Sequence, residues 1–131
     1  MKIGELPEDM QSLLGQIAID SRSNAWKNEA SFAKIDLPLY ILPLSAFPRI
    51  DPEHDPGDDR KFEDYLNTAM EDFPPVVIAH GYFIDGRHRV WAARERGEGE
   101  IRAVDASKVL GKRFVEEWLF LGPLQSSRFR S

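Results

Sequence analysis

The stretch Phe83-Ile84-Asp85-Gly86-Arg87-His88-Arg89-Val90-Trp91-Ala92-Ala93 decides the fold of this chain. Its first two residues, Phe83 and Ile84, are apolar, as in a buried strand, and Asp85-Gly86 then interrupts the strand. From Arg87 onward the apolar residues recur at helical spacing, and Gly97 is a natural C-terminal cap for a helix over residues 87–96. The stretch therefore predicts a strand that passes directly into a helix.

A junction of this kind is suited to holding a phosphate group. The first turn of a helix has unpaired N–H groups at the positive end of the helix dipole. A glycine at position 86 lets a ligand approach the backbone without meeting a Cβ. Arg87 and Arg89 add guanidinium donors that match phosphate oxygens, and His88 adds an imidazole. We predict that Gly86, Arg87, His88 and Arg89 bind phosphate.

Three of these side chains also have a structural interpretation. Asp85 either caps the helix, by accepting from an N–H of its first turn, or serves as a magnesium ligand or general base. His88 either hydrogen-bonds a backbone carbonyl or donates to a ligand phosphate. Arg89 either contacts the ligand or pairs with a buried carboxylate such as Asp105 or Glu63.

The remaining elements follow from hydrophobic periodicity on either side of the junction. Helices are expected over residues 8–20, 26–32, 60–71 and 107–121, with Asp58 or Asp59 as the N-cap of the third. Strands are expected over residues 37–44, 76–79, 82–84 and 101–104. Two prolines in the first of these strands predict that it lies at a sheet edge, and His80-Gly81 predicts a hairpin turn. Trp91 has the spacing of a core residue.

Residues 47–57 are expected to form a loop, because they contain three prolines. Residues 51–59 hold five acids and no lysine or arginine. One interpretation is a solvated acidic loop. The alternative is that Glu53 or Asp58 leans over the cationic helix start and orients a hydroxyl or a metal ion.

Composition narrows the class of protein. The 131 residues, 42% of them hydrophobic, fit one domain with an ordinary core. The absence of cysteine excludes thiol catalysis, disulfides and thiolate metal sites. Met1 to Glu5 lack a secretory pattern and no apolar run approaches the ~20 residues of a membrane helix, so we expect a cytoplasmic protein without a membrane partner. The net charge is −5, but residues 87–96 contain four arginines and one acid. A local cationic site in an acidic protein favours a small anionic ligand over a long polyanion.

The order of these segments resembles the ParB N-terminal/sulfiredoxin-like superfamily. The resemblance is carried by the apolar run 40–44, Pro75-Val76-Val77-Ile78, the Phe83 to Ala93 stretch, and Gly97 followed by a strand at Ile101. It covers residues 37–105 and implies an α+β fold, a small mixed sheet with flanking helices. Residues 1–36 are then expected to form a helical N-terminal extension packed on a domain over 37–121, with 122–131 as a loose tail.

The resemblance also implies nucleotide binding, with the phosphates at the helix that the motif opens. Sulfiredoxins carry a catalytic cysteine where this chain has Arg87, so sulfinic acid repair is excluded. The Gly-x-Arg-Arg box of the partition proteins, which bind CTP and DNA, is altered at His88. Free serine kinases of this fold carry Asp-Gly-His-His-Arg, which this chain matches except at Arg87. Those kinases use an upstream glutamate, for which Glu53 is the candidate.

We therefore expect a nucleotide-binding protein, either an ATP-dependent phosphotransferase or an NTPase, with ATP or another nucleotide and Mg²⁺ as cofactors. The expected catalytic residues are Asp85, His88 and Glu53, and Asp85 is the expected metal ligand. One alternative is a ParB-like DNA-binding protein or nuclease. The side chains that would contact backbone phosphates are then Arg87, Arg94, Arg96, Arg128 and Arg130. Another is a non-catalytic interaction or inhibitor protein that binds a protein partner through the N-terminal extension or the C-terminal helix.

Overall fold

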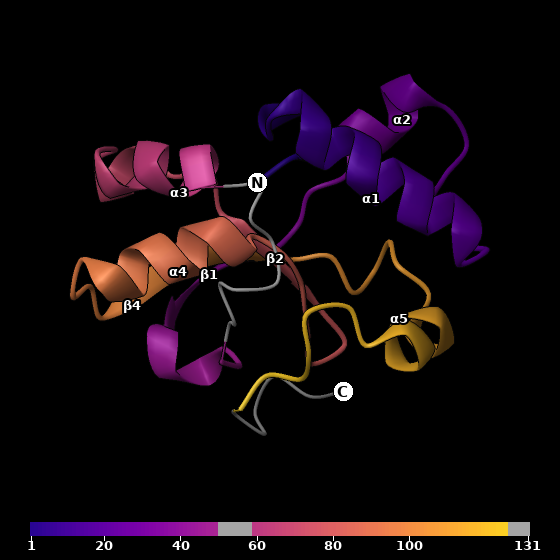
Figure 1. Cartoon of the computed structure of the whole chain (residues 1–131). Coiled ribbons are helices and arrows are strands. Elements are labelled where there is room, and N and C mark those ends of the chain that lie inside the picture. Colours follow the sequence, from indigo (N-terminus) through magenta and orange to yellow (C-terminus); the bar gives the residue numbers. More distant parts are fainter. Residues whose placement is uncertain (50–58, 126–131) are drawn as a thin grey trace.

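A four-stranded open sheet with the strand order β1-β4-β2-β3 forms the centre of the fold (Figure 1). The computed structural model describes residues 1–49 and 59–125. β4 lies antiparallel to β1 and parallel to β2, and β2 and β3 form an antiparallel hairpin. The expected α+β architecture, a small mixed sheet with flanking helices, is confirmed. The strands are β1 (Leu39–Pro43), β2 (Val76–Ala79), β3 (Tyr82–Asp85) and β4 (Glu100–Asp105).

Residue type explains the place of each strand in the sheet. β2 is central and reads Val-Val-Ile-Ala, and all four of its residues are buried because helices cover both faces of the sheet. β1 is an edge strand, as predicted, with proline at its last position and at the residue before its start. The hairpin turns at His80 (φ 53°) and Gly81 (φ 82°), two consecutive left-handed residues of the kind that fit the twist of paired strands.

The helices cover the two faces of the sheet in separate groups. The first 36 residues and the C-terminal helix pack on one face, around Leu14, Val77 and Val115. The helix that follows β3 and the helix that precedes β2 pack on the other, around Phe73, Ile78 and Val90. The helices are α1 (Glu8–Asp20), α2 (Glu29–Ala33), α3 (Asp59–Leu66), α4 (Arg87–Glu95) and α5 (Lys112–Trp118), and short 3-10 turns lie at η1 (Ile3–Glu5), η2 (Leu44–Ala46) and η5 (Met70–Asp72).

Three helices differ from the predicted ranges. α2 begins at Glu29 rather than at residue 26, because the Asn28 side chain accepts from Ser31 N–H and caps it there. α3 ends at Leu66 rather than at residue 71, because Ala69 is extended and a 3-10 turn follows. α5 spans only Lys112–Trp118 of the predicted 107–121, since Leu119 and Phe120 are left-handed (φ 61° and 45°).

The segment after α5 lies against the sheet edge formed by β3. Leu121 N–H donates a hydrogen bond to Phe83 C=O, and Phe83 N–H donates one to Gly122 C=O. Leu124 N–H donates to Gly81 C=O, and Leu124 is fully buried. Residues 122–125, which we assigned to a loose tail, therefore cover this edge.

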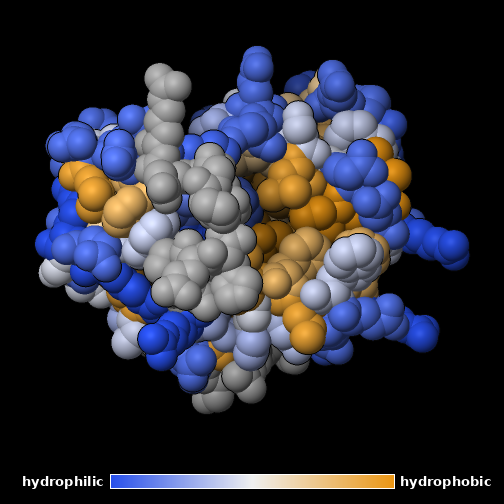
Figure 2. All heavy atoms as spheres, in the orientation of Figure 1, coloured by the Kyte–Doolittle hydropathy of each residue, from blue (hydrophilic) through white to orange (hydrophobic). Residues whose placement is uncertain are grey.

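Some apolar surface remains exposed. Figure 2 shows it gathered in a hollow on the right half of the view, in the region where Figure 1 places α1 and α5. Trp118 at the end of α5 is 67% exposed and Leu119 is 50% exposed. Binding of a protein partner to this C-terminal helix stays a prediction. None of the helices within residues 1–49 and 59–125 combines the length and hydrophobicity needed to cross a membrane.

Candidate functional site

Gly86, between β3 and α4, stands at a position where the backbone geometry requires glycine. Gly86 occupies the N-cap position of α4 with φ +121°. A Cβ on Gly86 would lie 2.5 Å from Val76 Cγ1 and 3.2 Å from Val76 Cα. The side on which a Cβ would stand is therefore filled by β2. Glycine is needed here for the turn and for close packing, and the expected role in letting a ligand approach is not what the geometry shows.

Asp85 is engaged by Arg89 one helical turn later. Asp85 Oδ2 lies 3.2 Å from Arg89 Nη2 in an ion pair, and the Asp85 side chain is 35% exposed. The interpretation of Asp85 as the N-cap is wrong, because Asp85 is still paired with Val77 in β3 and Gly86 occupies the cap position, with no side-chain cap hydrogen bond. The ion pair orients the carboxylate beside the first turn of α4.

Arg89 is the one charged side chain classed as buried among the described residues, and its guanidinium bonds the protein's own backbone. Arg89 Nη1 donates to Pro75 C=O at 2.7 Å and to Pro74 C=O at 3.1 Å, and it lies 3.4 Å from Met10 Sδ. Of the two interpretations of Arg89, the structure has the one in which it pairs with a carboxylate, although the partner is Asp85 instead of Asp105 or Glu63. These bonds connect α4 to the chain that leads into β2 and to α1, so Arg89 supports the site instead of presenting its charge to it.

Arg94 in α4 and Arg96 at its C-cap also donate to backbone carbonyls of the protein. Arg94 donates to the carbonyls of Leu44, Phe47 and Pro48 at 2.8–2.9 Å, and burial lowers the pKa of Arg94 from its ordinary value. Arg96 donates to the carbonyls of Tyr65 and Thr68. Both were expected on backbone phosphates in the DNA-binding alternative. In the structure they satisfy the carbonyls of segments that precede β2.

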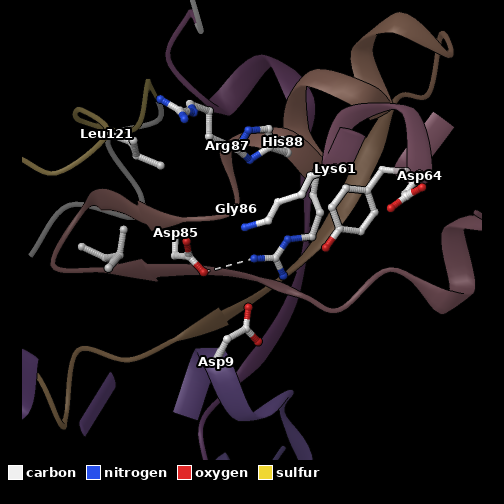
Figure 3. A pocket seen from close by; sticks show the side chains of 11 residues that line it. Asp9, Lys61, Asp64, Asp85, Gly86, Arg87, His88 and Leu121 are labelled. Atoms are coloured by element: carbon white, nitrogen blue, oxygen red, sulfur yellow. Dashed lines mark hydrogen bonds and ion pairs between the residues drawn. The ribbon is translucent and has the colours of Figure 1, made fainter. Parts of the chain in front are cut away.

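A cavity of about 550 Å³ opens at the start of α4 (Figure 3). The predicted phosphate-binding residues all line it, and Arg87 and His88 are half-buried at its wall. Figure 3 shows the Arg87 side chain extending toward the side of Leu121, away from Asp85. The lining residues are Asp9, Lys61, Asp64, Tyr65, Ile84, Asp85, Gly86, Arg87, His88, Arg89 and Leu121.

Four of the polar lining residues were missed by the sequence analysis. Lys61, Asp64 and Tyr65 come from α3, and their i, i+3, i+4 spacing places them on one helix face. That spacing was readable in the sequence, but nothing in it showed that α3 lies opposite the start of α4. Asp9 comes from α1, in the N-terminal extension, and no local signal pointed to it.

The predicted catalytic and metal residues are brought together only in part. Asp85 and His88 line the same cavity, whereas Glu53 and Asp58 lie outside the described residues. Within residues 1–49 and 59–125, no group of three or more His, Cys, Asp or Glu side chains is arranged to hold a metal ion. A magnesium ion bound by one or two carboxylates together with ligand phosphates does not need such a group, and Asp85 fits that arrangement.

Comparison with known proteins adds one short match. A stretch of 41 residues, 30% of this chain, is 46% identical to part of the transcriptional regulator NovG of Streptomyces niveus. The match spans only 13% of the length of NovG. No protein family matches the chain, and no solved structure matches it.

Proposed function

We propose that this chain binds a nucleoside triphosphate, with the phosphates at the N-terminus of α4, and that it is a ParB/sulfiredoxin-like protein. The observation that carries the proposal is the convergence of the Gly86-Arg87-His88 helix start and Lys61 on one cavity. The cavity of about 550 Å³ is within the range of ~300–1,000 Å³ found for small-molecule sites.

The electrostatics of the cavity favour a phosphate that carries a cation. Arg87, His88 and Lys61 supply donors, and the amides of the first turn of α4 supply more. Asp9 and Asp85, two carboxylates that also line the cavity, repel a bare polyphosphate. A bound Mg²⁺ ion neutralises part of the phosphate charge, so the proposed ligand is a magnesium–nucleotide complex, with Asp85 as the protein's magnesium ligand.

The roles we propose for phosphoryl transfer or NTP hydrolysis follow from this placement. Magnesium would polarise the phosphoryl group, which is the chemistry that it supplies in such sites. Arg87 neutralises charge on the phosphate oxygens, and His88 donates to one of them. Asp85, oriented by its ion pair with Arg89, either holds the metal ion or accepts a proton from the acceptor hydroxyl or water. Glu53 remains a proposed catalytic residue.

Calorimetric titration with ATP, CTP and ADP, each with and without Mg²⁺, tests binding. We expect saturable binding that requires Mg²⁺ and weakens at least about tenfold in Arg87→Ala, since that variant loses a charge-assisted contact. Absence of binding at about millimolar nucleotide would overturn the proposal.

A separate assay for released phosphate or ADP tests catalysis. Turnover by the wild type and its loss in Asp85→Asn are expected, and the unfolding transition of that variant shows whether the Arg89 environment survives. A wild-type chain that binds nucleotide without turnover would restrict the function to binding.

DNA binding is the second candidate function, and the partial match to the regulator NovG is the observation that favours it. The engagement of Arg94 and Arg96 by backbone carbonyls removes two of the cations that this alternative needs. Fluorescence anisotropy with a DNA duplex over a salt series tests it, because affinity falls by a log–log slope of about −0.9 per phosphate contact. Nuclease activity on the same duplex is the matching catalytic assay.

A further inference from the structure

The packing of α3 on α4 fixes the side of the cavity opposite the α4 N-terminus. Phe62 of α3 and Trp91 of α4 stack with ring centroids 3.7 Å apart and an angle of 15° between the ring planes. Tyr65 packs against Phe73, with ring centroids 5.1 Å apart. These contacts set the rotation of α3 about its axis, and Lys61 therefore faces the cavity.

Lys61 is an exposed side chain on the cavity side of α3. Within residues 1–49 and 59–125 no hydrogen bond or ion pair engages the Lys61 ammonium. Figure 3 shows the Lys61 side chain extended toward Gly86 and Asp85, while the Asp64 carboxylate points the other way. An ammonium group so placed contrasts with Arg89, whose donors are taken by protein carbonyls.

The cations that line the cavity come from two elements. Arg87 and His88 belong to the first turn of α4, whose backbone amides can hold one phosphate group. Lys61 reaches the cavity from α3. Figure 3 shows the Arg87 and Lys61 side chains on different sides of Gly86, with Lys61 on the side of Asp85. A single phosphate on the Arg87 side would leave Lys61 without a partner, whereas a chain of phosphates can extend from Arg87 to Lys61.

We propose that Lys61 is a phosphate-binding residue that contacts a phosphate beyond the one held at the α4 N-terminus, and so sets the preference for nucleoside di- and triphosphates over monophosphates. This inference rests on the proposed function, because it needs a nucleotide in this cavity. The consequence is that affinity should rise with the number of phosphates in the nucleotide, and that this rise should depend on the Lys61 side chain.

The test is the affinity of wild type, Lys61→Met, Lys61→Arg and Lys27→Met for AMP, ADP and ATP in Mg²⁺, with CMP, CDP and CTP measured in parallel. Lys27 is the matched control, an exposed lysine that does not line the cavity. Methionine keeps the length of the aliphatic stem while removing the charge, and unfolding midpoints show that each variant is folded.

We expect Lys61→Met to weaken triphosphate binding by about 10- to 100-fold, as for one lost charge-assisted contact, and to leave monophosphate binding nearly unchanged. Lys61→Arg should keep most of the triphosphate preference, and Lys27→Met should match wild type. Equal losses for mono- and triphosphate, or no loss at all, would overturn the role of Lys61 while leaving the proposed function intact. A wild-type chain that binds none of the six nucleotides overturns both.

Discussion

Replacing Arg89 by methionine should destabilise this chain more than any exposed substitution. Arg89 is 5% exposed and donates to Pro75 C=O at 2.7 Å, to Pro74 C=O at 3.1 Å and to Asp85 Oδ2 at 3.2 Å. Methionine fills much of the same space but donates nothing, so two carbonyls and a partly buried carboxylate lose their partner. Removal of one partner from a buried charged network costs about 3–5 kcal/mol.

The assay is reversible urea denaturation of wild type, Arg89→Met and Arg113→Met. Arg113 is the control because its side chain is 93% exposed and pairs only with Glu117 one helical turn away, a contact worth about 0.3–0.5 kcal/mol. The Arg89 variant should lose about 3–5 kcal/mol of unfolding free energy in urea, which corresponds to a loss on the order of 10–20 °C in melting temperature. A loss under about 1 kcal/mol, close to that of Arg113→Met, would refute the reasoning and show that water replaces the guanidinium at these carbonyls.

Three further predictions test the same junction and its supports. Gly86→Ala should lower the free energy of unfolding by about 2–5 kcal/mol in urea titrations, because the added Cβ meets Val76 at 2.5 Å in a left-handed backbone. Gly97→Ala is the control: Gly97 has φ +74° with nothing within 4 Å, so this variant should lose only about 1 kcal/mol to backbone strain. Equal losses for the two variants would contradict the packing argument. Arg94→Ala should cost about 1–3 kcal/mol of unfolding free energy by removing the donor to three carbonyls, and a neutral result would show that those carbonyls face solvent. Arg96→Ala should leave the salt dependence of any DNA affinity unchanged, since its guanidinium donates to Tyr65 and Thr68; a slope reduced by about one would place Arg96 on a DNA phosphate.

The strand-to-helix junction was predictable because each of its parts has a local cause. The β2–β3 hairpin follows from two apolar runs around His80-Gly81, and α4 follows from Gly86, the periodicity after it and Gly97. α1 has the predicted bounds, Glu8–Asp20. The edge position of β1 followed from its prolines.

The side-chain assignments within the junction depended on tertiary contacts that no local pattern reveals. A sequence shows that Arg89 follows Asp85 by four residues, but it does not show that the carbonyls of Pro74 and Pro75 lie under the guanidinium. The pairing of Asp85 with Val77 keeps Asp85 in β3, so that Gly86 occupies the cap position. The predicted end of the last helix was wrong for a similar reason, because the left-handed turn at Leu119 ends α5 although the helical periodicity of the sequence continues.

The cavity wall was predictable only on the α4 side. Lys61 and Asp9 reach the cavity from elements that are distant in sequence, and their positions depend on how α3 and α1 pack. Trp91 packs on Phe62 of α3, but it is half-buried and lies outside the core that its spacing predicted.

A titration of ¹⁵N-labelled protein with magnesium–ATP, followed by NMR, tests the central claim most directly. The account predicts saturable shifts of the backbone amide signals of Gly86, Arg87 and His88, together with a shift at Lys61, and weaker binding in Arg87→Ala. Unmoved signals for these amides at about millimolar nucleotide, in a protein whose spectrum shows it folded, would contradict the claim that phosphates bind at the start of α4.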